Sequence, residues 1–222
     1  MSSFTDAQAV SNYTSRPAQQ VPGFHDLQRM AAILLAERAP DNAEILVLGA
    51  GGGLELRAFA QRHPNWRFTG VDPSAEMLAL ARQTLGPLAA RATLVEGYID
   101  TAPPGPFDGA TCILTLHFVP RAERVNTLAE LRRRLKSGAP LIIAHHSFPA
   151  GQAESWLNRY ADFATPDGAD PAKARAGAQA IAQKLPILSP EDEMAALAEA
   201  GFTEIAQFYQ GFTFRGWVAT AP

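Results

Sequence analysis

Three alternating glycines, Gly49, Gly51 and Gly53, follow an apolar run and precede a helical pattern. Glycine lets the backbone turn sharply and lets a ligand approach main-chain N–H groups closely. The spacing G-x-G-x-G is complete, with Ala50 in the first gap, whereas the dinucleotide fingerprint G-x-G-x-x-G needs a glycine where Leu54 stands. No Lys-Ser or Lys-Thr pair follows, which excludes a P-loop. We therefore expect a nucleoside-type ligand here; the alternative is a tight strand-to-helix turn without a ligand.

A carboxylate at the end of the next strand strengthens this interpretation. Asp72 lies 19 residues after Gly53 and closes a second apolar run. A carboxylate in that position accepts hydrogen bonds from the vicinal hydroxyls of a ribose. The alternative is an acid stabilised by the positive end of the following helix. Together with the glycine turn, Asp72 favours ribose binding.

Two further loops are expected at the same edge of the sheet, where open α/β folds bind ligands. Gly97-Tyr98-Ile99 follows the third strand, and Tyr98 and Ile99 are candidates to flank an adenine ring. The alternative for Tyr98 is a half-exposed loop aromatic. Thr115, at the end of the fourth strand, is expected to reach the same crevice.

Histidines are the candidate proton acceptors. His117 follows the fourth strand and His145 ends the fifth, and a histidine of near-neutral pKa acts as a general base. A structural histidine bonded to the backbone is the alternative for both. His145 and His146 are adjacent on a strand and point to opposite faces, so no metal site is predicted.

The elements that must position these residues follow from hydrophobic periodicity. Apolar runs alternate with helical stripes, which indicates a parallel sheet wrapped by helices, and a close terminal connection indicates an antiparallel hairpin. The predicted fold class is α/β, a Rossmann-like seven-stranded mixed sheet flanked by helices. The expected strands are 45–48, 66–71, 92–96, 108–116, 140–145, 203–209 and 212–220, and the expected helices are 24–39, 54–63, 76–85, 122–136 and one that starts at Ser189.

The chain of 222 residues (23.8 kDa) is expected to form a single domain over 1–222. It carries an N-terminal arm, 1–22, and an Ala-rich helical lid or insertion, 150–185. Tyr13 in the arm is a third candidate base if the arm folds over the crevice; the alternative is a disordered tail. Trp156, Tyr160 and Phe163 share a helix face and suit either core packing or an apolar acceptor pocket.

These motifs resemble the class I S-adenosylmethionine-dependent methyltransferases over about Glu44 to Ser147. The resemblance implies S-adenosylmethionine as cofactor, with the glycine turn near its methionine end, Asp72 on the ribose, and Pro73 and Met77 near the adenosine. The cofactor-binding residues expected in this way are Phe24, Gly49, Ala50, Gly51, Gly53, Asp72, Pro73, Met77, Gly97, Tyr98, Ile99, Ile113 and Thr115.

Stretches 21–24, 114–118 and 200–202 also resemble the carboxy-S-adenosylmethionine synthases of tRNA modification, in which an aromatic residue at the position of Phe24 contacts the cofactor. Three positions depart from these families. Val47 stands where most class I members have an acid, and Ile113 where the synthases have asparagine. The synthase arginine has no counterpart in register, Arg175 being the nearest. Ordinary methyl transfer, by in-line displacement, is therefore favoured over carboxylate chemistry.

Charge and cysteine content limit the kinds of partner and cellular location that we expect. The net charge of −3 gives no case for stable nucleic-acid binding, and no apolar run is long enough to span a membrane. The single cysteine, Cys112, allows no intrachain disulfide, and a cytoplasmic location is expected. We expect a monomer or homodimer that methylates a small-molecule acceptor. The alternatives are a synthase-like enzyme that modifies the cofactor and a non-catalytic protein that binds S-adenosyl compounds.

Overall fold

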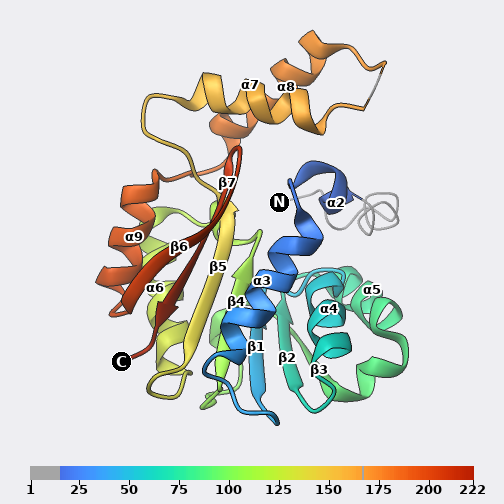
Figure 1. Ribbon diagram of the computed structural model, residues 1–222, viewed down its shortest axis with the longest axis vertical. Coiled ribbons are helices and arrows are strands. Elements are labelled where there is room, and N and C mark those ends of the chain that lie inside the picture. The colour runs from blue at the N-terminus through green and yellow to red at the C-terminus, as the bar shows by residue number, and fades with distance from the viewer. Residues whose placement is uncertain (1–15, 167) are drawn as a thin grey trace.

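A computed structural model of the protein describes residues 16–166 and 168–222, and its centre is a seven-stranded sheet of order β3-β2-β1-β4-β5-β7-β6 (Figure 1). The strands are β1 Glu44–Leu48, β2 Arg67–Asp72, β3 Ala92–Glu96, β4 Gly109–Ile113, β5 Pro140–His146, β6 Thr203–Gly211 and β7 Phe214–Thr220. Strands β1 to β5 pair in parallel, and β7 is antiparallel to both β5 and β6. This confirms the predicted fold class.

Helices cover both faces of the sheet, with α3 and α4 on one side and α6 and α9 on the other (Figure 1). The α-helices are α2 Arg16–Gln20, α3 Phe24–Ala36, α4 Leu54–Arg62, α5 Ala75–Leu85, α6 Arg121–Arg133, α7 Ala153–Ala164, α8 Pro171–Lys184 and α9 Pro190–Glu199; short 3-10 turns occupy 86–91, 99–101 and 116–118. No helix of the described residues has the length and apolar content that a membrane span requires.

Strand β1 shows why the sheet is buried on both faces. Ile45 and Val47 pack with the cluster that includes α3 and α4, whereas Leu46 and Leu48 pack with the cluster that includes α6 and α9. Successive strand residues point to opposite faces, so a continuous apolar run suits a strand with helices on both sides. The strand is therefore buried in the centre of the sheet, and the glycine turn follows its last residue at the carboxyl end of the parallel strands.

Two helices begin at the serine N-caps that the sequence predicts. The hydroxyl of Ser74 accepts the N–H of Met77, 3.2 Å away, and that of Ser189 accepts the N–H of Asp192. The fourth strand is shorter than predicted, because it ends at Ile113 instead of residue 116. Leu114 has a φ of 58°, which is incompatible with an extended strand and redirects the chain.

Helices α7 and α8 lie against each other beyond the carboxyl end of β5 (Figure 1). Arg175 of α8 joins Asp162 of α7 through two contacts of 2.9 Å. Tyr160 is buried, but Phe163 is 42% exposed, so the predicted aromatic stripe is only partly core. Whether this helix pair is a lid, and whether 1–22 is an arm, stay predictions; Tyr13 lies outside the described residues.

Candidate functional site

The glycine turn joins β1 to α4 and needs glycine for two separate reasons. Gly49, Gly51 and Gly53 all have positive φ, at 79°, 49° and 80°. Their surroundings are also crowded: a Cβ on Gly49 would lie 1.9 Å from Thr115 Oγ1, and one on Gly53 would lie 2.8 Å from Ala81 Cα. The turn is therefore pressed against β4's loop on one side and α5 on the other, and only glycine fits.

Asp72 at the end of β2 is bonded directly to this turn. Its Oδ2 accepts the N–H of Gly51 at 2.8 Å, and its Oδ1 accepts the N–H of Ser74 at 3.0 Å. Burial raises the pKa of Asp72 above its ordinary value, although the N–H groups of Ser74 and Gly51 act in the opposite direction. A carboxylate offers about four lone-pair positions, so these two bonds leave one on each oxygen for a ligand.

The loop after β3 reaches the same place. The N–H of Gly97 donates to the backbone oxygen of Asp72 at 3.0 Å. Gly97 has a φ of 138°, and a Cβ there would lie 2.5 Å from Thr101 Oγ1. Tyr98 is 60% exposed, whereas Ile99 is buried in the core. The structure thus brings Gly51, Asp72 and Gly97 together, and the roles of Tyr98 and Ile99 toward an adenine stay predictions.

The remaining predicted cofactor residues flank this edge. Phe24 opens α3 and is buried next to Val21, and the turn before it is fixed by Tyr209, whose hydroxyl donates to the Pro22 oxygen at 2.6 Å. Thr115 contacts the position of Gly49, as described above. Ala50, Met77 and Ile113 are buried, and Pro73 is exposed.

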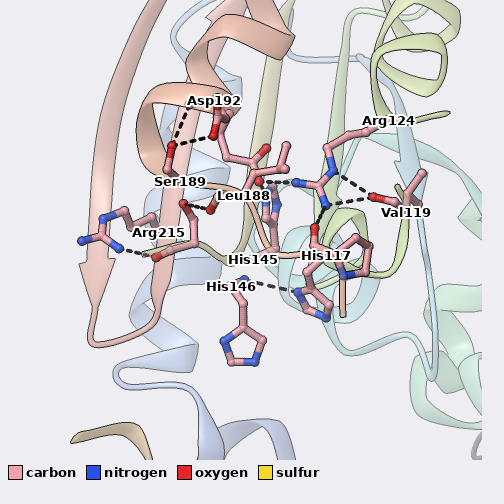
Figure 2. A network of polar contacts seen from close by, with 12 residues as sticks. His117, Val119, Arg124, His145, His146, Leu188, Ser189, Asp192 and Arg215 are labelled. Atoms are coloured by element: carbon pink, nitrogen blue, oxygen red, sulfur yellow. Dashed lines mark hydrogen bonds and ion pairs between the residues drawn. The ribbon is translucent and has the colours of Figure 1, made fainter. Parts of the chain in front are cut away.

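His117 has a defined tautomer in this structure. Its Nδ1 accepts the backbone N–H of His146 at 3.2 Å, so the neutral ring carries its proton on Nε2 (Figure 2). Burial, together with His146, His145 and Arg124, lowers the pKa of His117 well below its ordinary value. A neutral ring with Nδ1 occupied is a hydrogen-bond donor through Nε2, which argues against the predicted role as base.

His145 packs against α9 and β7. Its ring is completely buried beside Trp217, and its Nε2 is 2.9 Å from Glu193 Oε1 without hydrogen-bond geometry. Arg124 also binds Glu193, and it donates to the backbone oxygens of Val119 and Pro186 (Figure 2). The contact of His145 with Glu193 therefore ties β5 to α9, and its ring centroid lies 6.2 Å from that of His117, so the structure brings these two candidate histidines together.

His146 points to the opposite face, as its adjacency to His145 requires. Its Nδ1 lies 2.9 Å from Thr213 Oγ1, and its ring stacks on Phe214 at 4.0 Å and meets Tyr160 edge-on. Burial, with a smaller contribution from His145, lowers the pKa of His146 to about 3. Within 16–166 and 168–222, no three His, Cys, Asp or Glu side chains gather as a metal site would need.

A cavity of about 300 Å³ lies between α2, α7 and α8. Its polar lining comes from Arg16, Gln20, Tyr160 and Thr165. Tyr160 also contacts His146, so the cavity adjoins the carboxyl end of β5. Its volume is at the lower end of the range for small-ligand sites.

Sequence reasoning missed Glu55, the second residue of α4. It is buried with Leu56, Phe59 and Ala60, and the Thr111 hydroxyl donates to its Oε1. Burial raises the pKa of Glu55 to about 8, and the Thr111 hydrogen bond opposes this only in part. The available signal was an acid on the apolar stripe of a helix that begins at the glycine turn.

These residues fit S-adenosylmethionine as a ligand. Its ribose diol matches the free lone pairs of Asp72, and the side-chain-free glycine turn and a buried carboxyl lie close by. The donor and acceptor set at this edge therefore suits a nucleoside that carries polar and charged groups.

Known proteins agree with this assignment. A methyltransferase-domain family matches residues 45–138. The carboxy-S-adenosyl-L-methionine synthase of Chromohalobacter salexigens is 29% identical over 96% of this chain and 82% of the relative. The trans-aconitate 2-methyltransferase of an Azoarcus species is 34% identical over 56% of this chain and 48% of the relative.

The fold also matches a solved structure, a putative O-methyltransferase from Nostoc punctiforme. The TM-score is 0.67 at 21% identity, over 96% of this chain and 58% of the Nostoc chain. This likeness supports the fold, and the sequence relatives supply the family. Together these findings support a class I S-adenosylmethionine-dependent methyltransferase, with S-adenosylmethionine as its cofactor.

Proposed function

We propose that this enzyme moves the methyl group of S-adenosylmethionine to a small-molecule acceptor, with the glycine turn and Asp72 as the centre of the cofactor site. The observation that carries the proposal is the hydrogen bond between Gly51 and Asp72. It places the turn of β1 and the acid of β2 in one rigid unit at the carboxyl edge of a parallel sheet, where such folds bind ligands.

When bound, the cofactor supplies a methyl group already activated by its sulfonium charge. The residues of the chain therefore need to position and desolvate the reactants. Asp72 holds the ribose with its two free lone pairs, and the glycine turn lets the amino-acid portion approach the backbone closely. Thr115 and the loop from Gly97 border this unit from β4 and β3.

His117 serves the acceptor side as a hydrogen-bond donor in this proposal. Its Nδ1 is occupied by the His146 N–H, and its lowered pKa keeps the ring neutral. A neutral N–H donor orients an oxygen-bearing acceptor, and an acceptor that is already ionised needs no base. The Azoarcus relative is named for trans-aconitate, a carboxylic acid, which makes carboxylates the first acceptors to test. The cavity beside Tyr160 and Arg16 suits such a molecule.

Calorimetry with S-adenosylmethionine and S-adenosylhomocysteine tests the cofactor site. We expect both to bind one to one. Incubation with methyl-labelled cofactor and a panel of carboxylic acids, led by trans-aconitate, then tests the acceptor class through label transfer. Absence of binding would remove the proposed site, and label transfer confined to non-acidic acceptors would remove the carboxylate assignment.

A carboxy-S-adenosylmethionine synthase is the second candidate, because that relative covers 96% of the chain. Arg175, the arginine nearest to the one the synthases use, is exposed and engaged by Asp162 in α7. This arrangement favours methyl transfer. Mass spectrometry after incubation with S-adenosylmethionine and prephenate separates the two, since a carboxylated adduct would establish the synthase reaction.

We further propose a cytoplasmic monomer or homodimer that does not bind nucleic acid stably. The buried free thiol of Cys112 suits a reducing compartment, and the net charge of −3 disfavours a phosphate backbone. Cell fractionation and light scattering of the purified protein test these statements. A membrane-associated pool or a larger assembly would contradict them.

A further inference from the structure

Glu55 is an acid in a position that packing alone would fill with an apolar residue. Helix α4 turns four residues to the interior, and Leu56, Phe59 and Ala60 are the other three. A buried carboxyl is costly when ionised, and with a pKa of about 8 Glu55 is mostly protonated at neutral pH. An interior acid of this kind beside a ligand site is a candidate for function.

The backbone register places Glu55 beneath the proposed cofactor site. Its partner Thr111 lies in β4 directly opposite Val47 of β1. Two residues beyond this pair, β1 gives way to Gly49 and β4 ends at Ile113. Glu55 therefore reaches the junction from the first turn of α4, immediately below the glycine turn.

The residue that follows Thr111 connects this part of β4 to the glycine turn. The thiol of Cys112 interacts with Thr115, and the charge of Glu55 acts on that thiol. Thr115 is the residue that crowds Gly49. Gly49 and Thr111, the partner of Glu55, thus lie near the point where β1 and β4 separate.

No cation among the described residues balances Glu55. It takes part in none of their ion pairs, and no described lysine, arginine or histidine shifts its pKa. The group bonded to it is the Thr111 hydroxyl of β4. The charge of Glu55 also acts on the Cys112 thiol, which lies on the opposite face of the sheet and which burial keeps protonated. Asp72, the other acid at this edge, is held by Gly51 and Ser74. If Glu55 ionises, the described residues offer no countercharge, and a cationic group of a ligand would supply one.

We propose that Glu55 is the carboxylate that receives the α-ammonium group of the methionine portion of S-adenosylmethionine. This assignment rests on the proposed function and deepens it. On binding, the Glu55 carboxyl releases its proton to solvent and the ammonium takes its place, so the buried region exchanges one positive charge for another. The bond broken is the carboxyl O–H, and an N–H···O hydrogen bond forms to the resulting carboxylate.

Proton release provides the decisive measurement. S-adenosylhomocysteine is titrated into the full-length protein at pH 7 in buffers of different ionisation enthalpy, with 5′-methylthioadenosine as a probe that lacks the amino-acid portion. A carboxyl with a pKa of about 8 is roughly nine-tenths protonated at pH 7, so we expect nearly one proton released per S-adenosylhomocysteine. We expect none with 5′-methylthioadenosine.

Glu55→Gln keeps the shape and the hydrogen bond to Thr111 but cannot ionise. We expect at least tenfold weaker binding of S-adenosylhomocysteine, no proton release, and unchanged binding of 5′-methylthioadenosine. Glu76→Gln on the neighbouring helix, an exposed acid, is the matched control and should leave all three values as in the wild type. If Glu55→Gln binds S-adenosylhomocysteine as tightly as the wild type, or loses affinity for both probes equally, the assignment is overturned.

Two outcomes separate this assignment from the proposed function. If the wild type binds S-adenosylhomocysteine without releasing a proton, Glu55 is not the ammonium partner and the cofactor site stands. If the wild type binds neither compound, the proposed site itself fails and this assignment fails with it. Should Glu55→Gln not fold, titration of the wild type from pH 6 to pH 10 decides alone, because the release must disappear above the pKa of Glu55.

Discussion

Asp72 Oδ2 and the N–H of Gly51 are 2.8 Å apart, so the acid at the end of β2 is a structural partner of the glycine turn before any ligand binds. One carboxylate oxygen holds this turn and the other holds the N–H of Ser74 at the start of α5. Because each oxygen retains a lone pair, the same side chain shapes the site and contributes to it.

Replacement of Asp72 by alanine should therefore weaken cofactor binding by at least tenfold. It removes charge-assisted hydrogen bonds worth about 1.5–3 kcal/mol and releases the Gly51 N–H from its fixed direction. Calorimetry with S-adenosylhomocysteine measures the change, and Asp100→Asn, an exposed acid in the next loop, is the control. An unchanged dissociation constant for Asp72→Ala would show that Asp72 lies outside the cofactor site.

Gly53 and Gly138 offer a matched test of crowding at the glycine turn. Both have a φ of 80°, but a Cβ would meet the Ala81 backbone at Gly53 and open space at Gly138. Gly138→Ala should lower the free energy of unfolding by about 1–2 kcal/mol, because alanine is strained in the left-handed backbone conformation. Gly53→Ala should lower the free energy of unfolding clearly more than Gly138→Ala does, because α5 must also shift to make room for the methyl group. Urea unfolding of both variants measures the difference, and equal losses would mean that α5 accommodates the methyl group freely.

Stability should depend on pH through Glu55. Its pKa is about 8 in the folded chain and near 4.5 when unfolded, so between these values only the unfolded state loses the proton. Folding stability from this residue is therefore complete below pH 4.5 and is lost as pH rises toward 8, by up to about 1.4 kcal/mol per pH unit. Urea unfolding from pH 5 to pH 8 should show Glu55→Gln gaining progressively on the wild type. Parallel curves for the two proteins would refute the raised pKa.

The buried pair Arg124–Glu193 should couple α6 to α9 strongly. Both side chains are fully buried, and removal of one partner leaves an unpaired charge at a cost of about 3–5 kcal/mol. A double-mutant cycle with Arg124→Met and Glu193→Gln should give a coupling of at least about 2 kcal/mol. The exposed pair Arg121–Glu199 joins the same two helices and should couple by less than about 1 kcal/mol. Similar coupling in both cycles would contradict this account.

Local sequence patterns were sufficient for most of the strands and helices and for the parallel sheet with its antiparallel terminal hairpin. The apolar run before Gly49, the Ser74 cap and the close terminal connection each predicted what the structure shows, because periodicity, capping and turn geometry act between near neighbours. The exception was β4, whose end at Ile113 depends on the positive φ of Leu114. No residue in the apolar stretch 108–116 predicts that the chain changes direction at Leu114.

The glycine turn, the acid at position 72 and the third loop could also be placed at one edge from the sequence, since parallel strands present their carboxyl ends together. The roles of the side chains could not be predicted from the sequence. His117 is a donor because the backbone N–H of His146, 29 residues away, is bonded to its Nδ1. His145 lies against Glu193, which also binds Arg124. Glu55 became recognisable only through Thr111, 56 residues distant. Protonation states depend on burial and on partners remote in the chain, and only the tertiary structure brings those partners together.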